Sequence, residues 1–164
     1  MIHWTDAGCP PVDSAVIEAL EAELGLRFPE ALKKVWARGD GREVENPKFY
    51  RDAPDGRELV DVMHHLLTVG DGELRRVTEV VRDFGVDRDV DLNRVIPIGN
   101  TGDGFICLDY RVTEQDPPVV DLSMSYAETV EPGEEVLIYV ANSFADFERM
   151  FTGDGAQRSA TTKP

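Results

Sequence analysis

Residues 95–110 read VIPIGNTGDGFICLDY, and this stretch decides the fold. Two apolar runs flank a turn that holds three glycines and Asp103. A Walker-type phosphate loop needs a lysine beside its last glycine, and no basic residue lies between Arg94 and Arg111. A dinucleotide-binding fingerprint needs a helix after the loop, whereas 105–110 is typical of a strand. The stretch therefore predicts two antiparallel strands joined by a glycine-rich turn.

On the carboxyl side, two more strands and a helix are predicted. The runs 118–124 (PVVDLSM) and 135–141 (EVLIYVA) are short and apolar, and turn residues separate them. A last helix is expected to begin at Ser143, with Asp146 as the second member of a capping box. Its apolar residues fall on one face: Phe144, Phe147 and Phe151, with Met150 beside them.

On the amino side, the pattern changes to helices. A helix is predicted over 13–24, capped by Asp13 or Ser14 and ended by Gly25. A second is expected to begin at Pro29 and end near Gly39.

Residues 39–58 form a polar, turn-rich connection with room for a short strand, and 59–69 are partly strand-like. A third helix is predicted over 72–84, with Gly85 ending it. Helices first, then strands, then a closing helix favour an α+β fold. We expect a mostly antiparallel sheet of about four to six strands with flanking helices.

The length of 164 residues suits one domain, which we place at 1–151, with a flexible tail at 152–164. No stretch approaches the ~20 apolar residues of a membrane helix. The first residues, MIHWTDAGCPPVDS, have neither the basic start nor the apolar centre of a signal peptide. These features predict a cytoplasmic protein.

The charge of the chain is strongly negative, at −15, and unevenly distributed. Residues 95–148 hold 11 acids and one base, Arg111, whereas 1–94 hold 20 acids and 13 bases. Such a surface repels nucleic-acid phosphates and anionic membranes. The charge indicates either a basic protein partner or simple solubility, and solubility alone does not require the segregation.

Sites for catalysis or metal binding are weakly indicated. The segment DRDVDLN (87–93) has the alternating acids of a calcium loop, but its sixth and twelfth positions carry Leu92 and Ile98 instead of glycine and glutamate. Adjacent His64 and His65 would point to opposite sides of a strand, one half-buried and one exposed. Cys9 and Cys107 are interpreted as free thiols. We predict no catalytic, cofactor-binding or metal-binding residue.

Four segments resemble the SUKH superfamily in their order and spacing. They are IEALEAELGLRFPEALKKVWARGDG (17–41), VIPIGNTGDGFICLDY (95–110), PPVVDLSM (117–124) and VANSFADFERMF (140–151). One departure is the turn Gly39-Asp40-Gly41, where the family usually has Asn-Gly-Gly. The resemblance implies antiparallel strands with flanking helices and no catalytic role. It also implies one of two functions: immunity proteins that neutralise polymorphic toxins, often nucleases, or regulatory scaffolds such as those of fungal cell-wall synthesis.

Combining charge with resemblance, we expect an immunity protein that binds a basic toxin domain, with no nucleic acid, membrane or cofactor. The alternatives are a scaffold for an endogenous protein and, less favoured, an enzyme. The predicted partner-binding residues are the acids of the 95–148 block that steer association, with Tyr126 as an aromatic anchor. They are Asp103, Asp116, Asp121, Tyr126, Glu128, Glu131, Glu134 and Glu135. A mobile hairpin tip remains the alternative for the loop 123–135.

Overall fold

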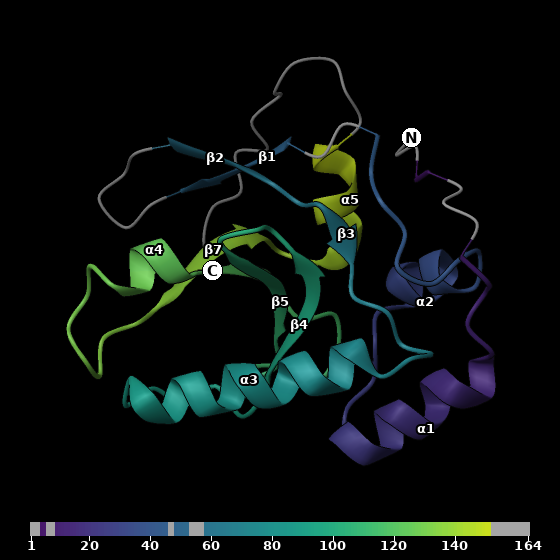
Figure 1. Cartoon of the computed structure of the whole chain (residues 1–164), viewed down its shortest axis with the longest axis horizontal. Coiled ribbons are helices and arrows are strands. Elements are labelled where there is room, and N and C mark those ends of the chain that lie inside the picture. Colours follow the sequence, from purple (N-terminus) through teal and green to yellow (C-terminus); the bar gives the residue numbers. More distant parts are fainter. Residues whose placement is uncertain (1–3, 6–8, 46–47, 53–57, 152–164) are drawn as a thin grey trace.

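Groups of helices and strands follow one another along the chain in the computed structural model, which describes residues 4–5, 9–45, 48–52 and 58–151 (Figure 1). The described helices are α1 (Ser14–Leu24), α2 (Glu30–Trp36), α3 (Glu73–Asp87), α4 (Met124–Ala127) and α5 (Phe144–Met150). The described strands are β1 (Lys48–Asp52), β2 (Glu58–Val62), β3 (His65–Leu66), β4 (Val95–Asn100), β5 (Gly104–Asp109), β6 (Val119–Ser123) and β7 (Leu137–Ala141). The expected tail at 152–164 lies outside the described residues.

The strands form one antiparallel sheet and one separate hairpin. The sheet has five strands in the order β3-β4-β5-β6-β7, and β1 pairs with β2 alone. The predicted α+β class, with a mostly antiparallel sheet and flanking helices, is confirmed. The partly strand-like segment 59–69 holds most of β2 and all of β3.

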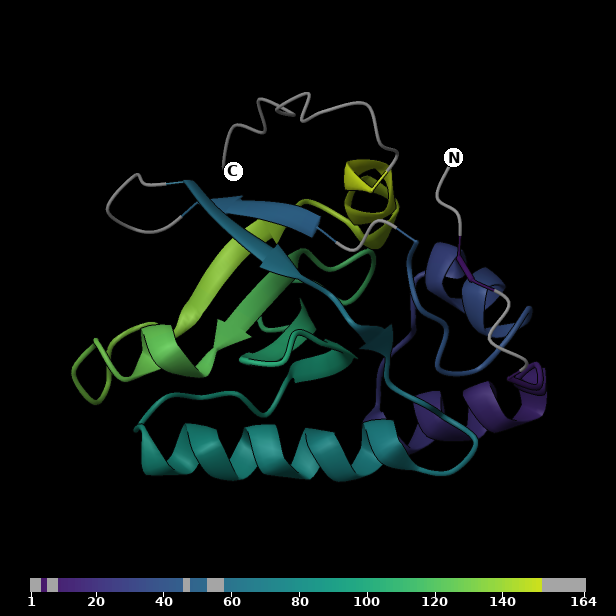
Figure 2. The same ribbon diagram turned by 45° about the horizontal axis from the view of Figure 1, so that its top comes forward.

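The two faces of the sheet bury different cores. Val95, Cys107 and Leu122 belong to the core under α3. Ile96 and Ile106, their strand neighbours, belong to the core shared with α1, α2, α5 and the hairpin. Figure 2 shows α3 on one side of the sheet and the hairpin with α5 on the other. The alternation of side chains along each strand therefore gives a three-layer arrangement.

The ends of two helices follow the predicted capping chemistry. Asp13 accepts a hydrogen bond from the N–H of Ala15 at 2.9 Å, and Gly25 ends α1 with φ +67°. Ser143 Oγ accepts from the N–H of Asp146 at 3.1 Å at the start of α5. Within the described part of the chain, no helix combines the length and apolarity that crossing a membrane requires.

The predicted end of the third helix at Gly85 is wrong, because α3 continues to Asp87. Gly85 faces the core, where a Cβ would lie 2.7 Å from the carbonyl oxygen of Val90 and 3.0 Å from the side chain of Leu92. The glycine is needed for the close approach of the returning chain, not to end the helix.

The glycine-rich turn joins β4 and β5, as predicted. The N–H of Thr101 donates to the carbonyl of Gly104 at 3.0 Å, and Gly102 has φ +83°. A Cβ on Gly104 would lie 1.9 Å from the carbonyl oxygen of Leu122. The glycines therefore serve a tight turn and a close strand contact.

Candidate functional site: an acidic corner

Two acidic loops lie side by side at the carboxyl end of α3. The N–H of Gly133 donates to the carbonyl of Arg88 at 2.8 Å. A Cβ on Gly133 would lie 3.8 Å from Oδ2 of Asp89. Both ribbon views place the loop after α4 beside this end of α3 (Figures 1 and 2). We call the segments 87–91 and 128–135 together the acidic corner.

The acidic corner combines seven exposed carboxylates with one basic residue. The acids are Asp87, Asp89, Asp91, Glu128, Glu131, Glu134 and Glu135. The base is Arg88, which is half-buried and donates through Nη2 to the carbonyls of Ala127 and Val130. Because this guanidinium is bound to backbone oxygens, it holds the two loops together and leaves the carboxylates facing solvent.

Several of these carboxylates also shape their own loops. Glu134 accepts from the N–H of Glu131 at 3.0 Å, and Asp91 accepts from the N–H of Asn93 at 3.0 Å. Glu135 lies 3.0 Å from Nη2 of Arg111, a half-buried side chain. Glu128 and Glu131 form no ion pair with any other described residue. The corner therefore keeps an uncompensated negative charge.

Tyr126 and Asp103 lie near α4, beside the corner. Tyr126 is half-buried, and its carbonyl accepts from the N–H of Thr129 at 2.8 Å, where the corner begins. Asp103 accepts from the hydroxyls of Ser123 and Ser125, both at 2.6 Å. Burial opposes the ionisation of Asp103, but these hydrogen bonds outweigh it and lower the pKa of the carboxyl. Asp103 thus ties the β4–β5 turn to α4.

Asp116 lies in the connection between β5 and β6, away from these contacts. Burial raises the pKa of Tyr110, and the charges of Glu21 and Asp116 raise it further. The hydroxyl of Tyr110 donates to the carbonyl of Arg27 at 2.6 Å. Asp116 is therefore oriented toward the α1–α2 connection, and the structure does not bring it into the corner.

Asp121 lies in the core, whereas the sequence suggested a surface position. Its side chain is 0% exposed and forms an ion pair with Arg51 of β1, which is 9% exposed. Arg51 also lies 3.3 Å from Asp61 of β2. Asp121 is on the sheet face that the hairpin covers, so its counter-charge is a residue of the same chain and not of a binding partner.

The three acids of 87–91 were not predicted as part of a binding surface. Their alternation suggested a calcium loop, but among the described residues no group of three or more His, Cys, Asp or Glu is arranged to hold a metal ion. The signal that identifies them is their contact with the 128–135 loop. That contact depends on the tertiary fold, because the two segments are far apart in the sequence.

The residues considered for catalysis are dispersed. Cys107 is fully buried, and burial raises the pKa of its thiol, so it is not a thiolate at neutral pH. His64 is exposed and His65 is half-buried, as the strand pattern predicted. Nε2 of His65 lies 3.7 Å from Oε1 of Glu73.

The fold is that of an α+β domain in which an antiparallel sheet lies between helices. The chain belongs to the SMI1 / KNR4 family (SUKH-1), whose model matches residues 11–150. The resemblance found in the four motifs is thereby confirmed. No curated protein matches the chain in sequence. Members of this family are generally non-catalytic immunity proteins or regulators that act through protein–protein contacts.

Proposed function

We propose that this protein is an immunity protein that binds a basic, nuclease-type toxin domain in the cytoplasm and neutralises it. The observation that carries the proposal is the acidic corner, where two loops present seven exposed carboxylates. Family membership supports the immunity class, and the net charge of −15 supports a basic partner.

A nuclease presents lysine and arginine side chains where it holds the phosphates of its substrate. Carboxylates on a rigid protein surface can pair with those cations and exclude the nucleic acid. Glu128 and Glu131 are best placed for such pairing, because neither forms an ion pair within the described chain. Glu134 and Glu135 extend the same surface, and half-buried Tyr126 beside it is the proposed anchor.

Of the remaining predicted residues, we propose Asp103 and Asp116 only as contributors to the long-range field. Opposite charges raise the association rate up to about 10⁸–10⁹ M⁻¹s⁻¹ at low salt, and distant carboxylates share in that effect. Asp121 is left out of the proposed contact surface because it is buried against Arg51.

The test is co-expression with the toxin domain encoded by the adjacent gene. Cells that produce the toxin domain alone are expected to die, and cells that also produce this protein are expected to grow. The double variant Glu128→Gln/Glu131→Gln should protect less well. The control Glu18→Gln/Glu43→Gln removes the same charge from exposed positions outside the corner and should protect like the wild type.

Death of the cells in the presence of the wild-type protein would overturn the proposal. So would the absence of a toxin gene combined with stable co-purification of a housekeeping complex, which would instead support a non-catalytic scaffold for an endogenous partner. If the two double variants protected equally well, the protein would still be an immunity protein, but the acidic corner would not be its toxin-binding surface.

A further inference from the structure

One row of residues crosses the whole sheet on the face that α3 covers. The strand registers pair His65 with Asn100, Asn100 with Phe105, Phe105 with Leu122, and Leu122 with Leu137. Directly paired residues share a face of a sheet. Leu122 and Leu137 are buried, whereas the other three are half-buried. The α3 layer therefore leaves the β3–β5 end of this row partly open to solvent.

A stripe along α3 borders that open end. Glu73, Val77, Val80 and Phe84 follow at spacings of four, three and four residues, which puts them on one side of a helix. The stripe faces the β3 end of the row, because Oε1 of Glu73 lies 3.7 Å from Nε2 of His65 on β3. Val77 and Phe84 are half-buried against the core, and Val80 is 54% exposed.

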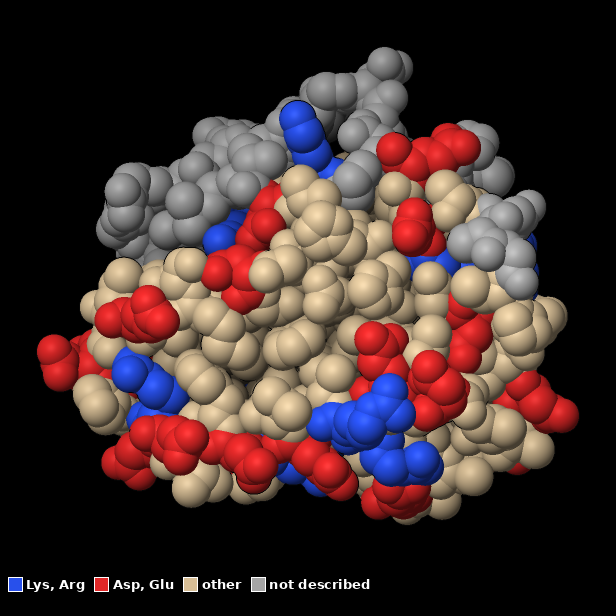
Figure 3. Space-filling model, in the orientation of Figure 1, with Lys and Arg blue, Asp and Glu red and all other residues tan. Residues whose placement is uncertain are grey.

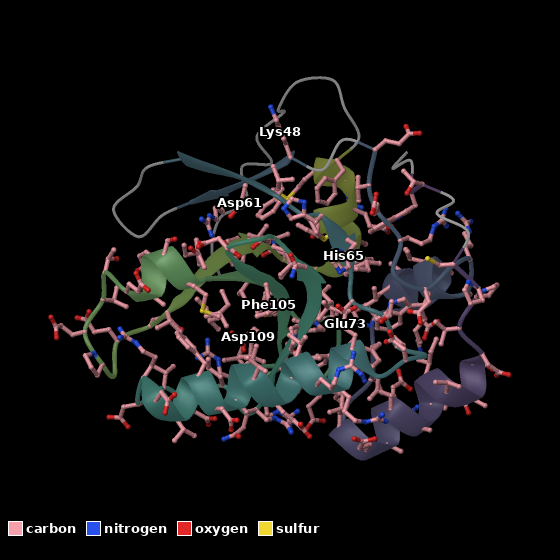
Figure 4. All side chains as sticks on the ribbon, in the orientation of Figure 1. Lys48, Asp61, His65, Glu73, Phe105 and Asp109 are labelled. Carbon is pink, nitrogen blue, oxygen red and sulfur yellow. The ribbon has the colours of Figure 1, made fainter. Side chains whose placement is uncertain are left out.

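The apolar residues of the stripe adjoin the open row. We call this surface the uncharged face: Val77, Val80 and Phe84 of α3, Phe105 of β5 and Met124 of α4. Figure 3 shows an area without charged side chains in the middle of this view, with mostly acidic and some basic side chains around it. In the same orientation, Figure 4 places Phe105 within that area and Asp61 and Glu73 at its border.

We infer that the basic toxin domain docks on the uncharged face as well as on the acidic corner, by placing an apolar segment between its own cationic side chains. This inference rests on the proposed function. Its physical basis is that interface energy concentrates in apolar anchors shielded from water, whereas charges at the border steer and orient the partner.

The charge around the face selects the occupant. A second copy of this chain would bring another net charge of −15 against the same acidic border, which disfavours self-association. A partner with cations flanking its apolar segment meets the border with opposite charge. The face also continues along α3 toward the corner, since Phe84 lies one turn before Arg88, whose N–H donates to the carbonyl of Phe84 at 3.0 Å.

The experiment compares Val80→Arg with Val16→Arg. The two valines are similarly exposed, at 54% on α3 and 43% on α1, and both substitutions add one positive charge. Val16 lies outside both the uncharged face and the acidic corner. The probe is the toxin domain encoded by the adjacent gene, with binding kinetics measured at roughly 150 mM salt.

We expect Val80→Arg to weaken binding about ten-fold or more, chiefly through faster dissociation, and Val16→Arg to weaken it by less than about three-fold. Methyl NMR of the wild-type chain gives a second readout that needs no variant. The methyl signals of Val77 and Val80 should shift in the complex, while those of Val16 should not.

The possible outcomes separate the two proposals. If the wild-type chain does not bind, the proposed function and this inference fall together. If it binds but Val80→Arg and Val16→Arg behave alike, or the methyl signals of Val77 and Val80 stay unchanged, the function stands and the uncharged face is not the contact. If the chain alone is a dimer that Val80→Arg dissociates, the face belongs to a second copy and the inference is wrong.

Discussion

Asp40 shows how one carboxylate can join two distant parts of this chain. It is buried in the turn after α2 and accepts from the N–H groups of Val69 and Gly70, at 2.8 and 2.7 Å. These backbone donors lie in the connection that leads into α3. The aspartate in the Gly-Asp-Gly turn therefore satisfies the buried donor of Val69, which would otherwise cost about 1–3 kcal/mol, and also binds the part-buried donor of Gly70.

Glu148 of α5 gives a pH prediction at the same scale. Burial raises the pKa of its carboxyl, and a hydrogen bond from Nε1 of Trp4 at 3.2 Å only partly offsets this effect. Because the folded-state pKa is above the unfolded value of 4.5, the folded protein binds more protons in the range between the two. The ionised carboxyl therefore destabilises the fold at neutral pH, and this cost disappears as the pH falls through that range.

We expect Glu148→Gln, which keeps an acceptor for Trp4, to raise the Tm at pH 7.5 and to lose that advantage toward pH 4.5. The control is Glu18→Gln, which removes the same charge from an exposed position of α1. The measurement is thermal unfolding followed by circular dichroism over this pH range. A Tm difference that grows on acidification would contradict the assignment.

Among the elements, the β1–β2 hairpin packs against the rest of the molecule without joining the larger sheet. Its strands pair with each other and with no strand of the larger sheet. Phe49 lies edge-on to Phe147 and Phe151 of α5, with ring centroids 5.7 and 6.3 Å apart. Arg51 reaches the buried carboxylate of Asp121 on β6. The hairpin is therefore held by an aromatic cluster and one buried ion pair.

Because of this ion pair, we expect the effects of mutating Arg51 and Asp121 on the free energy of unfolding to be strongly non-additive. Arg51→Met alone leaves the carboxylate of Asp121 buried without its partner, and it is expected to cost about 3–5 kcal/mol in the free energy of unfolding. Asp121→Leu alone should cost less, because Arg51 keeps Asp61 at 3.3 Å. The double variant removes both charges and should recover most of that loss. Urea unfolding of the four proteins measures the coupling.

The exposed pair Arg75–Glu23 is the matched control for this cycle. Its side chains are both 48% exposed and the paired nitrogen and oxygen lie 2.6 Å apart, so solvent screening should make its coupling much weaker than that of the buried pair. If the buried and exposed cycles gave the same coupling energy, the Arg51–Asp121 pair would not be what holds the hairpin.

The elements that could be predicted are those whose signals are local. The spacing of apolar residues and the caps Asp13, Gly25 and Ser143 located α1 and α5 because the relevant hydrogen bonds join near neighbours. Gly85 misled the prediction for α3 because its reason is a contact with the returning chain at Val90 and Leu92. The burial of Asp121 was equally invisible, because Arg51 supplies its counter-charge from another element.

At the scale of the whole molecule, the decisive feature is how the fold gathers charge. The distribution of charge along the chain predicts an acidic surface in 95–148, and the acids of 128–135 are exposed together in one loop. The acids of 87–91 join them only because the end of α3 lies against that loop, at the Arg88–Gly133 hydrogen bond. A contact between segments so far apart in the sequence cannot be predicted from local patterns. The 87–91 part of the candidate site was therefore identified only from the structure.

This gathered charge predicts how binding depends on salt. The on-rate for the toxin domain should fall steadily between roughly 50 and 300 mM salt, because the Debye length shortens over that range. Glu128→Gln/Glu131→Gln should lower the on-rate and flatten its salt dependence, more than Glu18→Gln/Glu43→Gln does. Stopped-flow measurement checks this, and an on-rate indifferent to salt would remove electrostatic steering.

The contact between Trp4 and Glu148 joins residues separated by 144 positions. Phe144 and Phe147 of α5 are both fully buried in the core that also holds α1 and α2. The core is thus completed by α5, the most carboxyl-terminal of the described helices. During synthesis, the nascent chain must leave the α5 side of the core unfilled until α5 has left the ribosome, so the domain becomes resistant to proteases and chaperone capture only after that point.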